Sequence, residues 1–189
     1  MTVAIIVIVV VVVVLALLAA VALPRMRSRR LQQQFGPEYE RTVGQAGDRR
    51  AAEQDLRERA ERRRELEIRP LEPQARDAYA ARWRGAQERF VDVPGEAVAQ
   101  ADALVQEVMR DRGYPVGDFD QQARDVSADH GDVVHEYHAA HEISLLNDGG
   151  RASTEQLREA MVHYRSLFAE LLDGGSPTGR EEARDQSAR

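Results

Sequence analysis

The chain has 189 residues, of which 31% are charged and 5% aromatic, so it has room for one domain of ordinary size plus additional segments. It has no cysteine, which excludes disulfides, thiolate metal sites and a cysteine nucleophile, and all 26 basic residues are arginine, which excludes a P-loop and a Schiff-base lysine. The net charge of −6 is uneven, with +3 over residues 25–67 and −9 over residues 68–189. The acidic distal part argues against nucleic acid as a partner.

Residues 3–23 form an uninterrupted apolar run of 21 residues without a charge. A helix of this length spans about 30 Å, the thickness of the hydrocarbon core of a bilayer. The run is rich in β-branched residues, but in lipid an isolated segment must satisfy its own backbone hydrogen bonds, which favours a helix. We therefore predict a single transmembrane helix over residues 3–23, with the lipid bilayer as its partner.

The alternative is a cleaved signal peptide, since "AVA" at residues 20–22 resembles a small-residue cleavage site. Two features disfavour cleavage: the two residues before the run carry no positive charge, and the run is longer than a typical signal-peptide core. Four arginines, at positions 25, 27, 29 and 30, follow the run, and the positive-inside rule then places the C-terminal domain in the cytoplasm. An envelope-side or secreted location remains the alternative.

Residues 24–36 are expected to form a basic juxtamembrane linker, and residues 37–67 a long, charged helix. Its apolar positions are sparse, and acid-to-arginine pairs four residues apart support it, namely Glu53 with Arg57, Asp55 with Arg59 and Glu58 with Arg62. Such a helix serves as a stalk, as a surface whose arginines touch anionic headgroups, or as a solvated helix lying on the domain.

Residues 68–173 are expected to form a small bundle of about five helices, which makes the fold all-α. Pro70 and Pro73 mark a break before the bundle. Apolar periodicity then predicts helices near 74–91 and 95–112, a short helix around 119–126, a helix through the histidine stretch to about 147, and a last helix that Ser153 and Gln156 begin with a capping box. Trp83 is assigned to the core, and residues 174–189 are expected to be a disordered tail.

The stretch "HGDVVHEYHAAHE", residues 130–142, holds four of the five histidines. On a helical projection His141 falls inside the apolar arc, His138 lies at its edge and His135 points to the far side. We therefore expect His141 to be buried and hydrogen-bonded in the core, so that His141→Ala destabilises the domain more than His135→Ala, by about 1–3 kcal/mol. The histidines do not fit the H-E-x-x-H pattern, because position 139 is alanine.

Several stretches, among them "FGPEYERTV", "YAARWRGAQERFVDVPGEAVAQAD", "VMRDRGYPV" and "STEQLREAMVHYRSLFAELL", resemble a family of uncharacterised bacterial proteins. This family is common in high-GC Gram-positive bacteria, and its members are described as secreted or membrane proteins. The resemblance covers most of residues 31–173. It implies a location at or outside the membrane, in tension with the arginine flank, and it carries over no activity and no functional residues.

These observations predict a membrane-anchored helical module with a non-enzymatic role in protein interaction or scaffolding. No catalytic, cofactor-binding or metal-binding residue is assigned, and the protein partner is not specified. The alternatives are an exported helical protein and a metal-binding helical protein that uses His138, His141 and His163.

Overall fold

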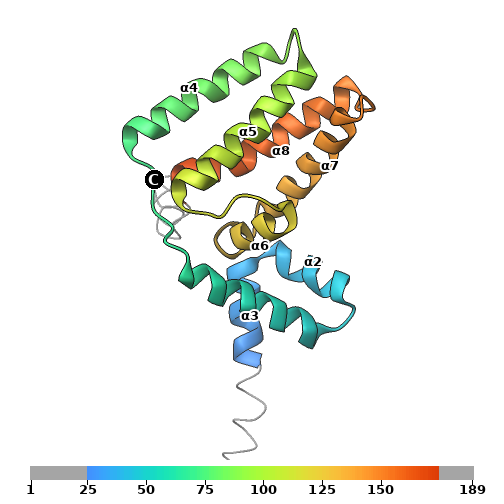
Figure 1. The fold of residues 1–189 in the computed structure, drawn as a ribbon. Helices are drawn as coiled ribbons and strands as arrows, with labels where there is room; N and C mark the ends of the chain where they lie inside the picture. The colour runs from blue at the N-terminus through green and yellow to red at the C-terminus, as the bar shows by residue number, and fades with distance from the viewer. Residues whose placement is uncertain (1–24, 175–189) are drawn as a thin grey trace, which may run out of the picture.

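The computed structural model describes residues 25–174, and this part of the chain is helical, without a strand (Figure 1). The expected all-α class is thus confirmed for the described residues. Residues 25–35 are helical. They are followed by α2 (Pro37–Ala46), α3 (Arg49–Glu65), α4 (Pro73–Arg89), α5 (Pro94–Arg112), α6 (Phe119–His130), α7 (Val134–Asp148) and α8 (Thr154–Asp173).

Helices α4, α5, α7 and α8 form the larger bundle, with α6 across one end (Figure 1). Its apolar side chains form one cluster, the main core, in which Trp83 stacks on Phe168 with ring centroids 4.6 Å apart. The assignment of Trp83 to the core is therefore confirmed. Five helices lie in residues 73–173, as expected, and each has the local signals that begin or end it. The capping box of Ser153 and Gln156 is present, and Gly113 ends α5 with a φ of 98°.

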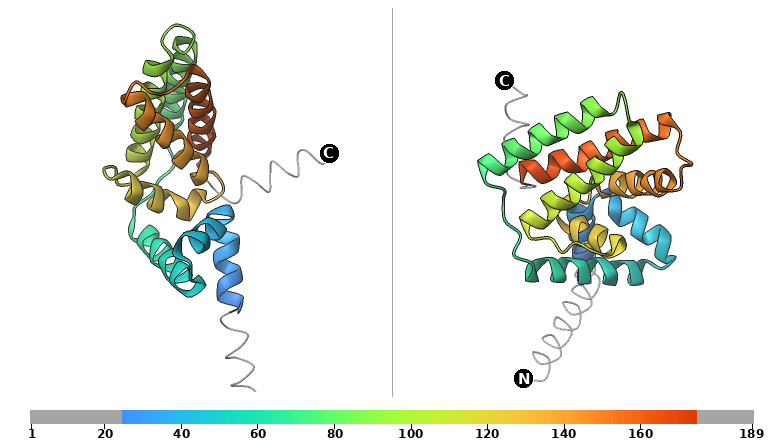
Figure 2. Two further views of the ribbon diagram at one scale, coloured as in Figure 1. Left: turned by 90° about the vertical axis from the view of Figure 1, so that its right-hand side faces the viewer. Right: turned by 45° about the horizontal axis from the view of Figure 1, so that its top comes forward.

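The helical segment 25–35 and the α2–α3 hairpin form a second layer that stacks on the α6 end of the bundle (Figure 2). Their apolar side chains enclose a smaller cluster, the second core, made of Leu31, Phe35, Tyr39, Leu56, Ala60 and Ala128. Ala128 comes from α6, so this helix has one face in each cluster, since Ala123 and Val126 belong to the main core. Helix α6 is the element that joins the two layers.

The prediction of one long helix over residues 37–67 is wrong, because the chain folds back on itself after residue 46. Gly47 adopts a left-handed conformation with a φ of 66° and ends α2, and the side chain of Asp48 accepts a hydrogen bond from the Ala51 N–H at the start of α3. The hairpin lies against the domain, which agrees with the interpretation of a helix lying on the domain and disagrees with an extended stalk.

The expected linker at residues 24–36 is helical from residue 25 to residue 35. Leu31 and Phe35 are four residues apart, on one face of this helix, and both are buried in the second core. Burial of this apolar pair stabilises a docked helix. The basic composition of the segment alone predicts a linker and does not reveal this burial.

The charge pairs expected within α3 are replaced in part by pairs between helices. Arg59 does pair with Asp55, at 2.5 Å. Arg62 instead reaches the buried carboxylate of Asp125 on α6, at 2.7 Å, and the Arg57 guanidinium donates to a backbone carbonyl. The arginines of α3 therefore hold the hairpin onto α6 in addition to stabilising their own helix.

No helix within residues 25–174 is both long and apolar enough to cross a membrane. The predicted span at residues 3–23 and the predicted tail from residue 175 onward lie outside the described residues.

Candidate functional site

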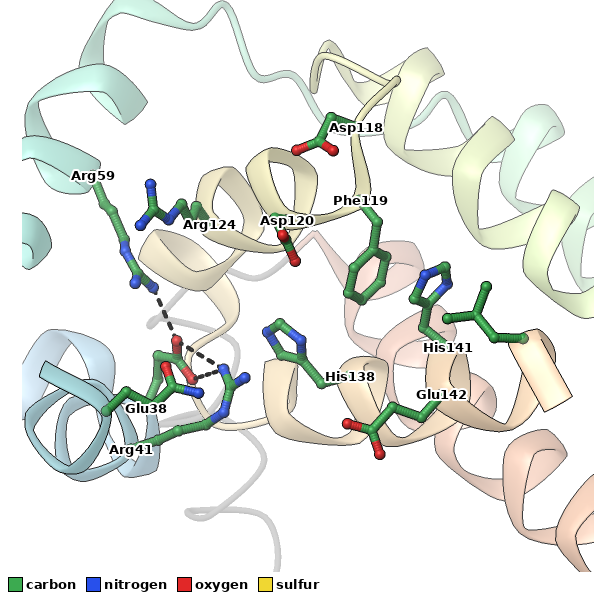
Figure 3. A pocket seen from close by; sticks show the side chains of 12 residues that line it. Glu38, Arg41, Arg59, Asp118, Phe119, Asp120, Arg124, His138, His141 and Glu142 are labelled. Carbon is green, nitrogen blue, oxygen red and sulfur yellow. Dashed lines mark hydrogen bonds and ion pairs between the residues drawn. The ribbon is translucent and has the colours of Figure 1, made fainter.

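A pocket of about 700 Å³ opens where the hairpin meets α6 and α7 (Figure 3). We call it the charged pocket, because seven of its twelve lining residues are arginine, aspartate or glutamate. It is lined by Glu38, Arg41, Gln45, Arg59, Asp118, Phe119, Asp120, Arg124, His138, His141, Glu142 and Leu145. Its volume lies in the range of small-ligand sites, but its lining is far more polar than that of a typical apolar ligand pocket.

One end of the charged pocket is built from three guanidinium groups that share two carboxylates. Glu38 is only 2% exposed, and it accepts hydrogen bonds from Arg41 at 3.2 Å and from Arg59 at 2.9 Å. Arg59 also donates to Asp55, and Arg124 lies 3.5 Å from the second oxygen of Asp55. Three guanidinium groups share these two carboxylates, so this end keeps several free N–H donors.

Three aromatic rings form the middle of the charged pocket. Asp118 caps α6 by accepting a hydrogen bond from the Gln121 N–H, which fixes Phe119 at the first position of the helix. The ring of His141 stacks on Phe119 with centroids 3.6 Å apart and an interplanar angle of 8°, and His138 meets the same ring edge-on at 5.3 Å. Phe119 therefore holds both histidines of α7 at the pocket wall.

Two carboxylates of the charged pocket have no ion pair or hydrogen bond within residues 25–174. Asp120 extends from α6 and Glu142 from α7, so they face the pocket from opposite sides (Figure 3), and both are exposed. Leu145, one turn beyond Glu142 on α7, is 55% exposed at the pocket margin. Glu142 therefore presents negative charge next to an apolar side chain, whereas Asp120 lies one turn before Arg124 on α6.

Burial lowers the pKa of His138 below its ordinary value of 6.5, and the positive charge of Arg41 lowers it further. The carboxylates of Glu38 and Asp120 oppose this shift without cancelling it. His138 is therefore neutral at pH 7 and offers one donor and one acceptor nitrogen instead of a fourth positive side chain beside the three arginines.

A second polar cluster lies behind the His141 wall and is part of the domain's internal packing. The Ser144 and Tyr164 hydroxyls are 3.0 Å apart, and Gln106 donates to Asp102 at 2.8 Å. Burial raises the pKa of Asp102, although a hydrogen bond from Tyr164 and the nearby His141 partly offset that effect. None of these four side chains lines the charged pocket, so they support its wall without facing a ligand.

The structure changes the interpretation of the histidines. His135 is exposed, as expected, but His141 is half-buried and held by ring stacking, so the prediction of a hydrogen-bonded core histidine is wrong. The reason is that the arc of α7 near His141 faces the first turn of α6 and the pocket instead of the main core. His138 and His141 share one environment around Phe119.

The three histidines of the metal alternative do not meet. His163 on α8 has its Nδ1 3.8 Å from a carboxylate oxygen of Glu136, and it does not line the charged pocket with His138 and His141. Within residues 25–174 no group of three or more histidine, aspartate or glutamate side chains is arranged to hold a metal ion.

Sequence reasoning missed His130, which is the fully buried histidine. Its Nε2 lies 3.4 Å from the Arg112 guanidinium, and its Nδ1 lies 3.6 Å from a carboxylate oxygen of Glu170. Arg112 is itself buried and donates to the carbonyls of Leu171 and Gly174 at the end of α8, at 3.0 Å each. The helical projection began after His130, so it gave no signal for this contact.

Sequence reasoning also missed the charged pocket as a whole, because its walls come from four helices. The position of Phe119 could have been derived from the N-cap Asp118 before it. The convergence of Arg41, Arg59 and Arg124 depends on the hairpin, whereas the sequence pattern predicts one long helix over residues 37–67.

Comparisons of the chain with protein-family models, with curated proteins and with solved structures find no match. The resemblance to a bacterial family of secreted or membrane proteins therefore stays a prediction.

Proposed function

We propose that the protein is a single-pass membrane-anchored module that binds a protein partner in the charged pocket. The observation that carries this proposal is the pocket's supply of unused polar groups: free guanidinium N–H donors at one end, and two exposed carboxylates without ion pairs, Asp120 on α6 and Glu142 on α7. Such groups gain ion pairs and hydrogen bonds when a complementary surface docks, and a matched charge pattern provides specificity and speeds association.

The anchor and its orientation are proposed from the sequence. The apolar run 3–23 has the length of a bilayer span, and the arginine-rich flank after it favours a cytoplasmic domain. A reporter that is active only outside the cytoplasm, fused after Arg189, tests the side of the membrane. We expect no reporter activity, and an active reporter would establish the exported alternative instead.

Partner binding is tested by site-specific photocrosslinking in the cell that makes the protein. A photoreactive amino acid at Leu145 stands at the pocket margin, and the same group at Val91 provides the control. Val91 is 84% exposed and lies in the α4–α5 connection, away from the pocket. We expect a discrete protein adduct from position 145 that is absent from position 91. If both positions give the same adducts, or neither gives any, the proposal is wrong.

A further inference from the structure

The charged pocket has two ends of opposite character, joined along one face of α7. His138 lies at the end formed by Arg41, Arg59 and Arg124, while Glu142 lies toward the other end (Figure 3). Leu145 lines the pocket three residues after Glu142 on α7. Positions 138, 141, 142 and 145 share one helix face, as their spacing requires. A ligand that follows this face therefore passes from the guanidinium groups, across the rings of His138, Phe119 and His141, to the unpaired carboxylate of Glu142.

The spacing of the two ends limits the size of the ligand's charged part. Seven residues separate His138 from Leu145, which corresponds to about 10 Å along the axis of α7. In an extended peptide, side chains two positions apart point the same way and their Cα atoms are about 7 Å apart. Long acidic and basic side chains that splay apart cover the remaining distance.

Resting on the proposed function, we infer that the charged pocket receives an extended segment of the partner protein in which an acidic and a basic residue are two positions apart. The acidic side chain accepts hydrogen bonds from the guanidinium end, where Arg124 is 51% exposed and has a single ion pair, at 3.5 Å. The basic side chain lies against Glu142 and Leu145.

The apolar part of the pocket fits the stem of a basic side chain. Arginine and lysine carry methylene groups that pack on apolar surface while the charged end stays among polar groups. Leu145 supplies such a surface one turn from Glu142, and its 55% exposure is reduced when the stem covers it. A neutral His138 adds no positive charge that would repel the basic side chain.

Isothermal titration of the full-length protein in detergent micelles tests this inference with short capped peptides. The probe is acetyl-Ala-Glu-Ala-Arg-Ala-amide, and two control peptides replace its glutamate or its arginine with glutamine. We expect each replacement to weaken binding about fivefold, the effect of one partly exposed ion pair. Equal affinity of the three peptides would overturn the inference.

Two pocket variants assign the charges to the two ends. In Glu142→Gln, the affinity difference between the arginine peptide and its glutamine control is expected to fall, while the difference between the glutamate peptide and its glutamine control remains. In Arg124→Gln, the glutamate difference should fall and the arginine difference should remain. Both side chains are exposed, so the fold is expected to survive, and thermal unfolding checks this.

The matched controls Glu159→Gln on α8 and Arg84→Gln on α4 remove exposed charges outside the pocket and should leave all affinities unchanged. Pocket variants that behave like these controls would contradict the inference.

Charge reversal gives a stricter test of the same assignment. In Glu142→Arg the preferred peptide should become the one with glutamate at both positions, which the unaltered protein binds weakly.

A zwitterionic lipid headgroup also carries one negative and one positive charge, so phosphoethanolamine is titrated in parallel. If phosphoethanolamine binds and the peptides do not, the pocket recognises a headgroup and the inference is wrong.

The two proposals fail in different ways. A discrete adduct from position 145 together with no selectivity among the peptides retains the protein partner and rejects the paired-charge segment. Absence of both the adduct and peptide binding rejects the proposed function itself.

Discussion

Phe119 gives the charged pocket its shape, because one apolar ring fixes the positions of two histidines. Its stacking on His141 and its edge contact with His138 place both imidazoles between the guanidinium end and the carboxylate end. A histidine that lies on an aromatic ring at the rim of a pocket keeps its nitrogens available to a ligand, which a histidine hydrogen-bonded in the core does not.

The histidines should differ in their contributions to stability in the order of their burial. We expect His130→Ala to lower the free energy of unfolding by about 2–4 kcal/mol, because it leaves a cavity and removes a partner of the buried Arg112. His141→Ala loses a ring stack and should cost about 1 kcal/mol, and the exposed His135→Ala less than about 0.5 kcal/mol. Urea unfolding measures all three, and equal values for His130→Ala and His135→Ala would contradict the burial pattern.

The lowered pKa of His138 predicts a loss of stability in mildly acidic solution. In the unfolded chain His138 takes up a proton as the pH falls through 6.5, while in the folded chain it resists protonation to a lower pH. Between these two pKa values the unfolded state binds more protons, so this histidine makes stability fall as the pH is lowered, and it has no such effect above about pH 7.5.

The comparison that isolates this effect is between the unaltered protein and His138→Gln. Both should show pH-dependent urea midpoints, since other groups also titrate, but the fall between pH 7.5 and pH 5.5 should be smaller in the variant. An identical fall in the two proteins would show that protonation of His138 is not coupled to folding.

At the scale of the elements, the second layer depends on close backbone contact between the segment ending in Phe35 and the α6–α7 connection. A Cβ atom on Gly131 would lie 2.4 Å from the carbonyl oxygen of Phe35. Since that oxygen belongs to the backbone, it cannot move away as a flexible side chain could. The short side chain of glycine therefore lets the segment ending in Phe35 approach α6 closely enough to bury Phe35 in the second core.

Two glycine-to-alanine variants should have opposite effects. Gly131→Ala is expected to lower the free energy of unfolding by about 2 kcal/mol or more, because the added methyl group separates the segment ending in Phe35 from the α6–α7 connection. Gly44→Ala lies inside α2 with nothing within 4 Å of the added carbon, so it should raise stability by about 0.5–1 kcal/mol. Thermal and urea unfolding distinguish them, and a stabilised Gly131→Ala would contradict the close contact.

The sequence predicted best those elements whose signals are local. The helices of residues 73–173 were located from apolar periodicity, from Pro70 and Pro73, and from the capping box at Ser153, because each signal acts within a few residues. The hairpin was missed although Gly47 and Asp48 together form a helix end and a helix start, since the charge pairs along residues 53–62 favoured continuity. The charged pocket could not be predicted, because it depends on how the hairpin docks on α6 and α7.

At the scale of the whole molecule, two apolar clusters of unequal size share one helix. The main core has 22 buried residues and the second core has six, and α6 contributes to both. The smaller cluster is supplemented by ion pairs between α3 and α6, such as that of Arg62 with the buried Asp125. Since less apolar surface is buried in the second layer, its local opening should require less free energy than opening of the bundle.

Native-state hydrogen exchange tests this difference. Amides of α2 and α3 are expected to exchange through openings of lower free energy than those of α5 and α8. In Phe35→Ala, a large-to-small change in the second core, protection should fall further in the hairpin than in the bundle. Uniform protection across all these helices would show that the two clusters open only together.

The way residues 25–39 are attached has a mechanical consequence. Ser28, Leu31 and Phe35 hold the first helical segment along its length, through the hydrogen bond of Ser28 to Glu53 and the packing of the two apolar side chains. Tension applied at residue 25 therefore loads these contacts together in shear instead of peeling them one at a time. Glu38 follows Phe35 by three residues and is held by Arg41 and Arg59, so any displacement of the segment under load is passed to the guanidinium end of the pocket as well as to α6, which Gln34 and Phe35 contact directly.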